Sequence, residues 1–370
     1  MFLFLKRMLF VFCLFFFSFC LSVPIDVLLV AYDTGDSNII RQLAEKMEKE
    51  SQSYSIVGFG RAKTIFKLHP KFQEIADGSV SDRSVLLSQK TICQLKKSFH
   101  PKVVFSGMAS TGQAQILNAF PNARTYAVYD NFDSPQKKDF IQPFIKEVGP
   151  ITGYMIPAGF LLKEFKNFLP AGSAIFVVGQ PALEDWASVF NNCDRVALRQ
   201  SLKIRKTEKV ILFAGGMDDT YAKYFDIFIQ AVKQRPSWRV FVTYHPKSTG
   251  EVERRIVEKY KASNVFVSND VKTNHLAIIA DILVCHKSSV CQQAFSVGVR
   301  CGYVVGDDYS NFLIDQGLVP KFNNSIDLLR FLDQEDAMPQ RDRLTKQRIA
   351  LDKSGVPTSA TQNIVHILRN

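Results

Sequence analysis

The sequence has few cysteines and no dense block of positive charge, and both shortages reduce the range of functions that it could have. Seven cysteines occur in 370 residues, and two of them lie in an apolar N-terminal run. The other five form an odd set without CxxC spacing: Cys93, Cys193, Cys285, Cys291 and Cys301. A metal site and a disulfide framework are therefore not expected. The formal net charge is +11. The basic residues are spread along the chain, so nucleic acid is not an expected partner.

Familiar nucleotide-binding and nucleophile motifs are also missing. The Gly/Ser/Thr-rich turn at residues 106–115, SGMASTGQAQ, contains neither GxGxxG nor GxxxxGK[ST]. This argues against a dinucleotide site and against a P-loop. No GxSxG elbow stands out, so a serine hydrolase of that type has no support. Two carboxylates at glycosidase spacing cannot be recognised from sequence, so a glycoside hydrolase is not supported either.

Long apolar runs are confined to the N-terminus. Lys6 and Arg7 precede an apolar stretch from Met8 to about Val23, which is typical of a secretory signal or a short membrane anchor. Because the positive charges lie on the N-terminal side, the body of the protein is expected outside the cytoplasm. Residues 1–23 therefore predict an exported or membrane-anchored protein. The net positive charge would also suit an anionic membrane surface as a partner.

The remaining chain alternates between buried-strand patterns and amphipathic helices. Apolar runs such as IDVLLVAY and VILFA each lead through a polar turn into a helix, which indicates parallel, doubly wound sheets. The alternation occurs in two halves, so the fold class is α/β with two Rossmann-like domains. The predicted boundaries are 24–193 for the first domain, 194–209 for a linker, 210–345 for the second domain and 346–370 for a C-terminal helical return.

Polar residues follow three strands of the second half, where ligands bind in such sheets. Gly215 and Gly216 end one strand and could bring backbone amides close to a phosphate. His245 and Lys247 follow the next strand, and His245 could donate a hydrogen bond to a phosphate or a sugar hydroxyl. Each feature also has a purely structural explanation, such as a tight turn or a strand end.

A pair of serines follows a third strand. Ser288 and Ser289 offer hydroxyls at the start of a helix, where they could hold a phosphate or cap the helix. In the first half, Asp33 and Asp130 follow strands and are the candidate general bases, in that order. Helix capping by these aspartates is the structural alternative.

Several of these motifs together resemble a known group. Gly215-Gly216, His245-Pro246, NDVKTNHLAIIADILV and HKSSVCQQAFSVG are similar to the C-terminal half of GT-B glycosyltransferases and their relatives. The relatives include nucleotide-sugar 2-epimerases, wall-polymer glycerophosphate transferases and bacterial sialyltransferases. The resemblance implies two Rossmann-like domains facing each other and a last helix that crosses back to the first. It also implies a nucleotide sugar held mainly by the second domain, with no obligatory metal.

One position departs from that pattern. Many such enzymes have a carboxylate after the serine turn that holds the ribose hydroxyls, and here Gln292 and Gln293 occupy the matching place. Gln293 remains a candidate ribose ligand, because an amide can still form hydrogen bonds to hydroxyls.

The resemblance implies transfer of a sugar from a nucleotide-activated donor to a glycan or another acceptor hydroxyl. The donor would be a co-substrate, and no separate cofactor is expected. A catalytically inactive, exported protein that binds a glycan or a nucleotide is the first alternative. A nucleotide-sugar 2-epimerase, in which Asp218 and Asp219 would act as acid and base, is the second.

Overall fold

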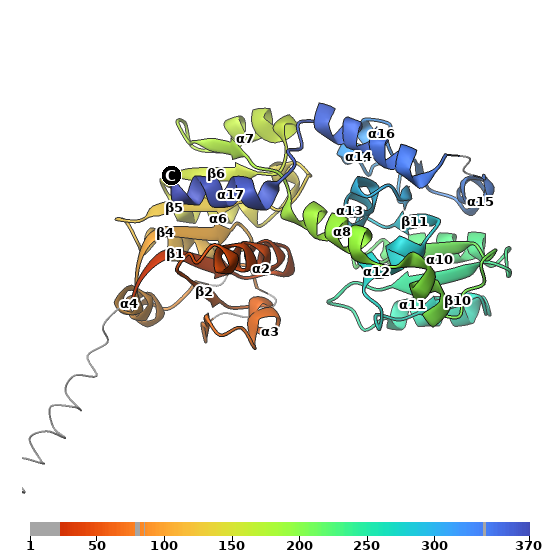
Figure 1. Cartoon of the computed structure of the whole chain (residues 1–370), viewed down its shortest axis with the longest axis horizontal. Coiled ribbons are helices and arrows are strands. Elements are labelled where there is room, and N and C mark those ends of the chain that lie inside the picture. Colours follow the sequence, from red (N-terminus) through yellow and green to blue (C-terminus); the bar gives the residue numbers. More distant parts are fainter. Residues whose placement is uncertain (1–22, 78–81, 85, 336–337) are drawn as a thin grey trace, which may run out of the picture. The chain divides into compact units, whose positions relative to one another are not determined.

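The computed structural model describes residues 23–77, 82–84, 86–335 and 338–370 (Figure 1). The chain forms two compact units. The first comprises the described residues up to Asp130, then Ser134–Gly179 and Ser359–Asn370; the second comprises Asn131–Asp133 and Gln180–Thr358. The expected N-terminal signal or anchor falls on residues 1–22, outside the described ranges. Within those ranges, no helix combines the length and apolarity needed to cross a bilayer.

The first unit contains a seven-stranded sheet with the order β3-β2-β1-β4-β5-β6-β7. All described pairings in it are parallel. The strands are β1 (Val23–Ala31), β2 (Tyr54–Gly58), β3 (Phe72–Glu74), β4 (Phe99–Gly107), β5 (Arg124–Val128), β6 (Gly153–Ile156) and β7 (Ile175–Val177). The chain order reverses between β1 and β4, and this switch point is where doubly wound sheets bind ligands.

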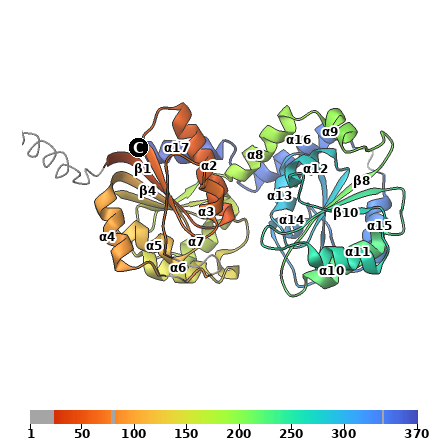
Figure 2. The ribbon, with the colours of Figure 1, turned by 90° about the horizontal axis from the view of Figure 1, so that it is seen from below.

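Helices cover both faces of this sheet (Figure 2). Because successive strand residues point to opposite faces, Leu29 of β1 packs in one core and Leu28 in the other. The first core is covered by α2 (Thr34–Lys49), α3 (Ala62–Phe66) and α17 (Ala360–Arg369). The second is covered by α4 (Gln89–Ser98), α5 (Thr111–Asn118), α6 (Ile141–Val148) and α7 (Leu162–Phe168).

The last helix belongs to the first unit although it comes after the whole second unit in sequence. Ile364, Val365 and Leu368 of α17 are buried in the same core as residues of α2. A side-chain nitrogen of Arg124 donates to the carbonyl of Leu368 at 2.7 Å. This confirms the expected return of a C-terminal helix to the first domain. The return starts at Ser359 and not at residue 346, because α16 (Gln340–Lys353) remains with the second unit.

The second unit contains a six-stranded sheet with the order β10-β9-β8-β11-β12-β13. Its described pairings are also parallel. The strands are β8 (Val210–Ala214), β9 (Arg239–Thr243), β10 (Val265–Val267), β11 (Ile282–Cys285), β12 (Arg300–Val304) and β13 (Lys321–Phe322). The order reverses between β8 and β11, which makes this pair the switch point. The two sheets confirm the predicted fold class.

The helices of the second unit also lie on both faces of its sheet (Figure 2). One core packs α10 (Tyr221–Val232), α11 (Glu251–Lys259) and α15 (Ser325–Asp333) against the strands. Within it, the ring of Phe213 lies 4.5 Å from that of Phe228, between centroids. The other face carries α12 (Thr273–Ile279) and α13 (Val290–Ser296), with α8 (Pro181–Asn192) and α9 (Arg195–Ser201) packed on them. A short helix, α14 (Phe312–Asp315), follows β12.

The boundary between the units falls at a different residue from the predicted one. The second unit takes up the chain again at Gln180, so α8 and α9 belong to it and not to the first domain or a linker. The physical reason is visible at α9, where Arg195 and Arg199 both donate to the carbonyl of Ile279, at 3.5 and 3.1 Å. These contacts attach the predicted linker to the end of α12.

Candidate functional site

The glycine turn after β8 is packed tightly between the ends of β9 and β11. The amide of Gly215 donates to the carbonyl of Thr243 at 2.8 Å. A Cβ on Gly215 would lie 2.8 Å from the Tyr221 hydroxyl, and one on Gly216 would lie 2.9 Å from the His286 ring. The glycines are thus required for packing. Of the two amides, only that of Gly216 has no hydrogen-bond partner in the described part of the chain, so it is the one available to a ligand.

His286 is a buried residue of this edge that the sequence analysis did not select. It directly follows β11, and its Nδ1 lies 2.9 Å from the carbonyl oxygen of Val304. Its Nε2 lies 3.1 Å from Oδ2 of Asp218. Both ring nitrogens therefore have an oxygen atom of the protein within hydrogen-bonding distance. The ring also stacks on Tyr224, with centroids 5.3 Å apart. These contacts hold the imidazole of His286 in a fixed position at this edge.

Asp218 connects this histidine to the neighbouring loop. Its carboxylate accepts from the amide and hydroxyl of Thr220, at 2.8 and 2.5 Å, and lies 3.3 Å from Nζ of Lys287. Partial burial raises the pKa of Asp218, but the hydrogen bonds from Thr220 and the charges of His286 and Lys287 outweigh it and hold the pKa at about 2. Asp218 is therefore ionised at neutral pH and partly neutralises the charge of Lys287 beside it.

Lys287 has an unusual backbone at the switch point. Its φ of +46° lies in the left-handed region that a side chain with a Cβ seldom adopts. Such strain is often found at functional sites, because the surrounding structure must enforce it. Here it places the lysine between the ends of β8 and β11, with its ammonium group beside Asp218 and Thr220.

The serine pair lies one step further along the chain. The hydroxyl of Ser288 accepts from the amide of Val290 at 3.3 Å, and the carbonyl of Ser289 accepts from the amide of Gln293 at 3.1 Å. Ser288 thus supports the turn into α13, as its structural explanation predicts. Its hydroxyl proton can still be donated to a ligand. Ser289 is exposed, and Gln293 is half-buried one turn later.

His245 and Lys247 follow β9, which is the neighbour of β8. Nδ1 of His245 accepts from the backbone amide of Lys247 at 3.1 Å. In the neutral ring the proton is therefore on Nε2, which is the tautomer suited to donate to an oxyanion. The Lys247 side chain is exposed. Together with Gly216 and the residues after β11, this forms the basic edge: Gly216, His245, Lys247, His286, Lys287 and Ser288.

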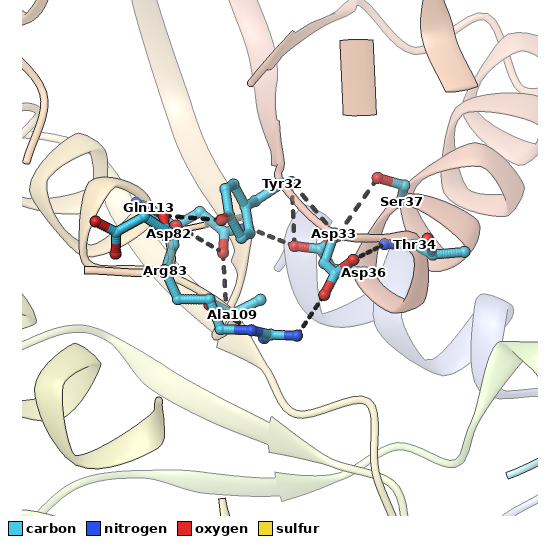
Figure 3. Close-up of polar contacts among 10 residues, drawn as sticks. Tyr32, Asp33, Thr34, Asp36, Ser37, Asp82, Arg83, Ala109 and Gln113 are labelled. Atoms are coloured by element: carbon cyan, nitrogen blue, oxygen red, sulfur yellow. Dashed lines mark hydrogen bonds and ion pairs between the residues drawn. The ribbon is translucent and has the colours of Figure 1, made fainter. Parts of the chain in front are cut away.

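The corresponding edge of the first unit is acidic (Figure 3). Asp33 follows β1 and caps α2, because its carboxylate accepts from the amide of Thr34 at 2.8 Å. The same carboxylate forms an ion pair with Arg83, whose guanidinium group also donates to the carbonyl of Ala109 at 3.3 Å. The ring of Phe140 lies 4.1 Å from that guanidinium group. Asp33 is thus committed to a cap and an ion pair.

Asp36 is buried in the first turn of α2. Its carboxylate accepts from the side-chain amide of Gln113 at 2.6 Å and from the amide of Tyr32 at 3.2 Å. Burial is the main reason that the pKa of Asp36 is raised to about 8, and the nearby charge of Asp130 adds to the shift. Gln113 also accepts from the amide of Ala109, so this contact connects the loops after β1 and β4.

Asp130 lies after β5, beside the start of α2. A Cβ on Gly35 would come within 1.7 Å of its Oδ2, so the helix approaches this carboxylate through a glycine. Asp130 remains partly exposed, yet burial raises its pKa and the charge of Asp33 raises it further, while Lys138 lowers it. A raised pKa suits a general base at neutral pH. On this geometry Asp130 is a better candidate base than Asp33. We define the acidic edge as Asp33, Asp36 and Asp130.

Comparisons with known proteins support the fold and little beyond it. No family model and no curated protein matches the chain. Among solved structures, a glycosyltransferase from Rickettsia africae superimposes with a TM-score of 0.64 at 10% identity, over 94% of this chain and 98% of that one. The wall teichoic acid polymerase TagF, in a form soaked with CDPG, gives 0.61 at 14% identity over 93% and 87%.

A protein of Listeria monocytogenes described as a UDP-N-acetylglucosamine 2-epimerase gives a TM-score of 0.67 at 13% identity, over 94% of this chain and 95% of that one. These matches span nearly the whole chain, and their identities are low. They show that the chain has the two-domain GT-B-like fold of glycosyltransferases and a nucleotide-sugar epimerase. The role of each residue has to be argued from the two edges themselves.

Proposed function

We propose that this protein is a glycosyltransferase that takes its sugar from a nucleotide-activated donor and passes it to an acceptor hydroxyl. In this proposal the basic edge of the second unit holds the phosphate groups of the donor. The acidic edge of the first unit supplies the base that removes the proton of the acceptor. Two structural neighbours support the donor class, one soaked with CDPG and one described as acting on a UDP-linked sugar.

The observation that carries the proposal is the pairing of His286 and Lys287 at the β8–β11 switch point. The imidazole of His286 is buried and held by contacts of both ring nitrogens, and the cationic Lys287 is held beside it by a left-handed backbone. Fixed positive charge stabilises a leaving phosphate without reorganisation during the reaction. The Gly216 amide and the Ser288 hydroxyl provide further donors at the same edge.

Asp130 is the base in this proposal. Its raised pKa makes it a better proton acceptor than an ordinary aspartate, and its partial exposure leaves it accessible to an acceptor hydroxyl. Asp36 is less suited to this role, since its carboxylate is buried and holds the β1 and β4 loops together.

Ligand binding is tested with a panel of UDP-, CDP-, GDP- and CMP-linked sugars and the free nucleotides. Thermal shift and calorimetry measure the binding. At a ligand concentration about 100 times its dissociation constant, a specific binder adds about 2.7 kcal/mol to the free energy of unfolding. The expected result is stabilisation by one nucleotide series. Stabilisation by none of them would contradict the proposal.

Matched variants locate the binding. His245→Ala and Ser288→Ala remove donors of the basic edge and should each abolish most of the shift. His275→Ala, on α12, changes a histidine with no part in the basic edge and serves as the control. Equal shifts in all three variants and the wild type would place the ligand elsewhere.

A protein that binds nucleotide or glycan without turnover is the second candidate. It is favoured by the ion pair between Arg83 and Asp33, which occupies one of the two predicted bases. Nucleotide binding without release of product from any donor would support it. Export remains a prediction for either candidate, and protease protection of the body in intact cells tests it.

A further inference from the structure

The second unit has a cavity at the opposite edge of its sheet from the basic edge. Its volume is 430 Å³, and it lies at the amino ends of β8, β11 and β12. Four basic side chains line it: Arg195, Lys209, Arg300 and Arg343. Two carboxylates, Asp281 and Glu335, also line it, so the lining has an excess of two positive charges. We call it the amino-edge cavity. Its volume lies within the range of about 300–1,000 Å³ that is common for small-ligand sites.

Lys209 lines this cavity and has hydrogen-bonding capacity to spare. Its ammonium group donates to the carbonyl of Leu332 at the end of α15, and it lies 5.0 Å from the Trp238 ring. An ammonium group has three donors, and within the described ranges this carbonyl is its only hydrogen-bond partner. Partial burial lowers the pKa of Lys209, and the nearby charge of Arg300 lowers it further. An anion in the cavity would oppose both effects, because a nearby opposite charge favours the charged form of the lysine.

Hydrogen bonds to backbone carbonyls hold two of the arginines, Arg300 and Arg343, in position. Arg300 donates to the carbonyls of Phe331 and Gln334, at 3.0 and 2.8 Å. Arg343 donates to the carbonyl of Gly298 at 3.0 Å. These bonds fix the guanidinium groups at the cavity wall before any ligand arrives. Preorganised guanidinium groups recognise phosphate well because their planar forks match its oxygens.

Asp281 is already occupied within the protein. Its Oδ1 lies 3.2 Å from Arg195, and its Oδ2 accepts from the amide of Val210 at 2.8 Å. Its negative charge is thus balanced by Arg195, which leaves Lys209 and the two remaining arginines facing Glu335. A dianionic group matches the resulting excess of charge, and a phosphate monoester carries about −1.5 to −2 at neutral pH.

We propose that the amino-edge cavity binds the phosphate group of a small phosphorylated molecule. This site is separate from the proposed nucleotide site, because the two lie at opposite ends of the same strands. It does not depend on the proposed function, and the two can fail independently.

The test measures binding of inorganic phosphate, pyrophosphate, glucose 1-phosphate and neutral glucose to the full chain by calorimetry. The phosphorylated probes should bind saturably, and glucose should not bind. Tighter binding of glucose 1-phosphate than of inorganic phosphate would identify a phosphate ester as the ligand class, and equal binding would identify the free ion. No saturable binding of any phosphorylated probe up to about 10 mM would overturn the proposal, since any remaining binding would be weaker than about 2.7 kcal/mol.

Substitutions then assign the binding to this cavity. Lys209→Gln should weaken binding at least about tenfold, as expected for loss of a charge-assisted hydrogen bond. Lys209→Arg should retain it, which separates loss of charge from loss of fold. Lys206→Gln, an exposed lysine nearby, is the matched control. Equal weakening in Lys206→Gln and Lys209→Gln would overturn the assignment.

Weaker binding can also result from a misfolded variant, so a variant that is expected to bind more tightly is a stronger test. Glu335→Gln removes an exposed carboxylate from the cavity wall and should tighten phosphate binding about threefold, as for an exposed charge pair. Glu258→Gln on α11 makes the same change away from the cavity and should have no effect. Unchanged or weaker binding in Glu335→Gln would contradict the proposed electrostatics. Nucleotide binding at the basic edge should be the same in all these variants.

Discussion

The carboxyl edges of the two sheets share a topology and differ in charge. In each unit the order of the strands reverses between the first strand and the fourth, and polar loops follow both. In the first unit these loops and the end of β5 bring together Asp33, Asp36 and Asp130. In the second unit, the matching loops bring Asp218 beside His286 and Lys287. The same topology therefore supports two chemistries, one suited to accept a proton and one suited to hold an anion.

Each edge also contains one residue of opposite charge at its centre. Arg83 forms an ion pair with Asp33 in the acidic edge, and Asp218 forms an ion pair with Lys287 in the basic edge, where it also contacts His286. A partner of opposite charge stabilises several charges of one sign at the same edge when no ligand is bound. Without a partner, burying a charge costs much free energy. Such partners also compete with any ligand for the same groups. Substitutions that remove a charge or its partner therefore test what each edge does.

The largest expected effect comes from Asp130→Asn. Loss of a general base lowers turnover by about 10²–10⁴-fold. Binding of the donor should be unchanged, because the basic edge is intact. Release of nucleotide from the donor identified by the ligand panel measures turnover, and calorimetry measures binding.

Asp33→Asn is the matched comparison for that experiment. Asp33 is engaged with Arg83 and Thr34, so its loss should lower turnover less than about tenfold, consistent with removal of a supporting contact. A larger loss in Asp33→Asn than in Asp130→Asn would restore Asp33 as the base, as sequence reasoning first ranked it.

The next effect is on stability and concerns Asp36. Burial, with the charge of Asp130 in second place, raises its pKa to about 8, well above that of an unfolded aspartate at about 3.9. Between these values the folded state binds more protons than the unfolded state. The free energy of unfolding therefore falls as pH rises from about 4 to about 8, by up to about 1.4 kcal/mol per pH unit.

Asp36→Asn should remove this dependence. Relative to wild type, the variant should become more stable as pH rises. Its free energy of unfolding should gain about 2–4 kcal/mol on that of the wild type between about pH 5 and about pH 8. Urea denaturation at several pH values measures it, and Asp139→Asn, which is exposed, is the control. Parallel pH profiles for wild type and Asp36→Asn would show that the carboxyl is ionised throughout this range.

A smaller effect is expected at the basic edge. Asp218→Asn frees Lys287 from its carboxylate partner and removes negative charge near the proposed phosphate position. Affinity for nucleoside diphosphates should rise about tenfold, which corresponds to about 1.4 kcal/mol. Asp219→Asn removes the same charge from an exposed neighbour that lacks these contacts, and it should change affinity much less. Weaker binding in Asp218→Asn would show that this carboxylate positions the side chains of His286 and Lys287 for the ligand.

Sequence patterns were sufficient to predict the two sheets, because each buried strand is a short apolar run followed by polar residues. The predicted strand VILFA corresponds to β8, and the predicted strand before the serine pair corresponds to β11. The boundary between the units was not predictable in this way. The helical pattern of α8 shows that one of its faces is apolar, but not which sheet that face packs against. In the structure it joins the second unit through α12 and α13.

The candidate site was predictable only where its residues follow strands directly. Asp33, Asp130, Gly216, His245 and Ser288 all have that position. His286 has it too, but nothing in VCHKSS distinguishes it from the end of a strand that leads to the serines. The contacts of Asp36 with Gln113 and of Asp33 with Arg83 join residues 77 and 50 positions apart. No local pattern signals such pairs, since they depend on tertiary packing.

The smallest expected effect tests the partner of the acidic edge. The charge of Arg83 lowers the pKa of Asp130, although burial has the larger and opposite effect. Arg83→Gln should therefore move the acidic limb of the pH profile of kcat/KM upward by less than about 1 pH unit, because an interaction of that size is worth about 1.4 kcal/mol. Arg61→Gln, which changes an arginine elsewhere in the first unit, is the control for the loss of charge. A downward shift in Arg83→Gln would mean that the limb reports a group other than Asp130, and the assignment of the base would then have to move to another carboxylate of the acidic edge.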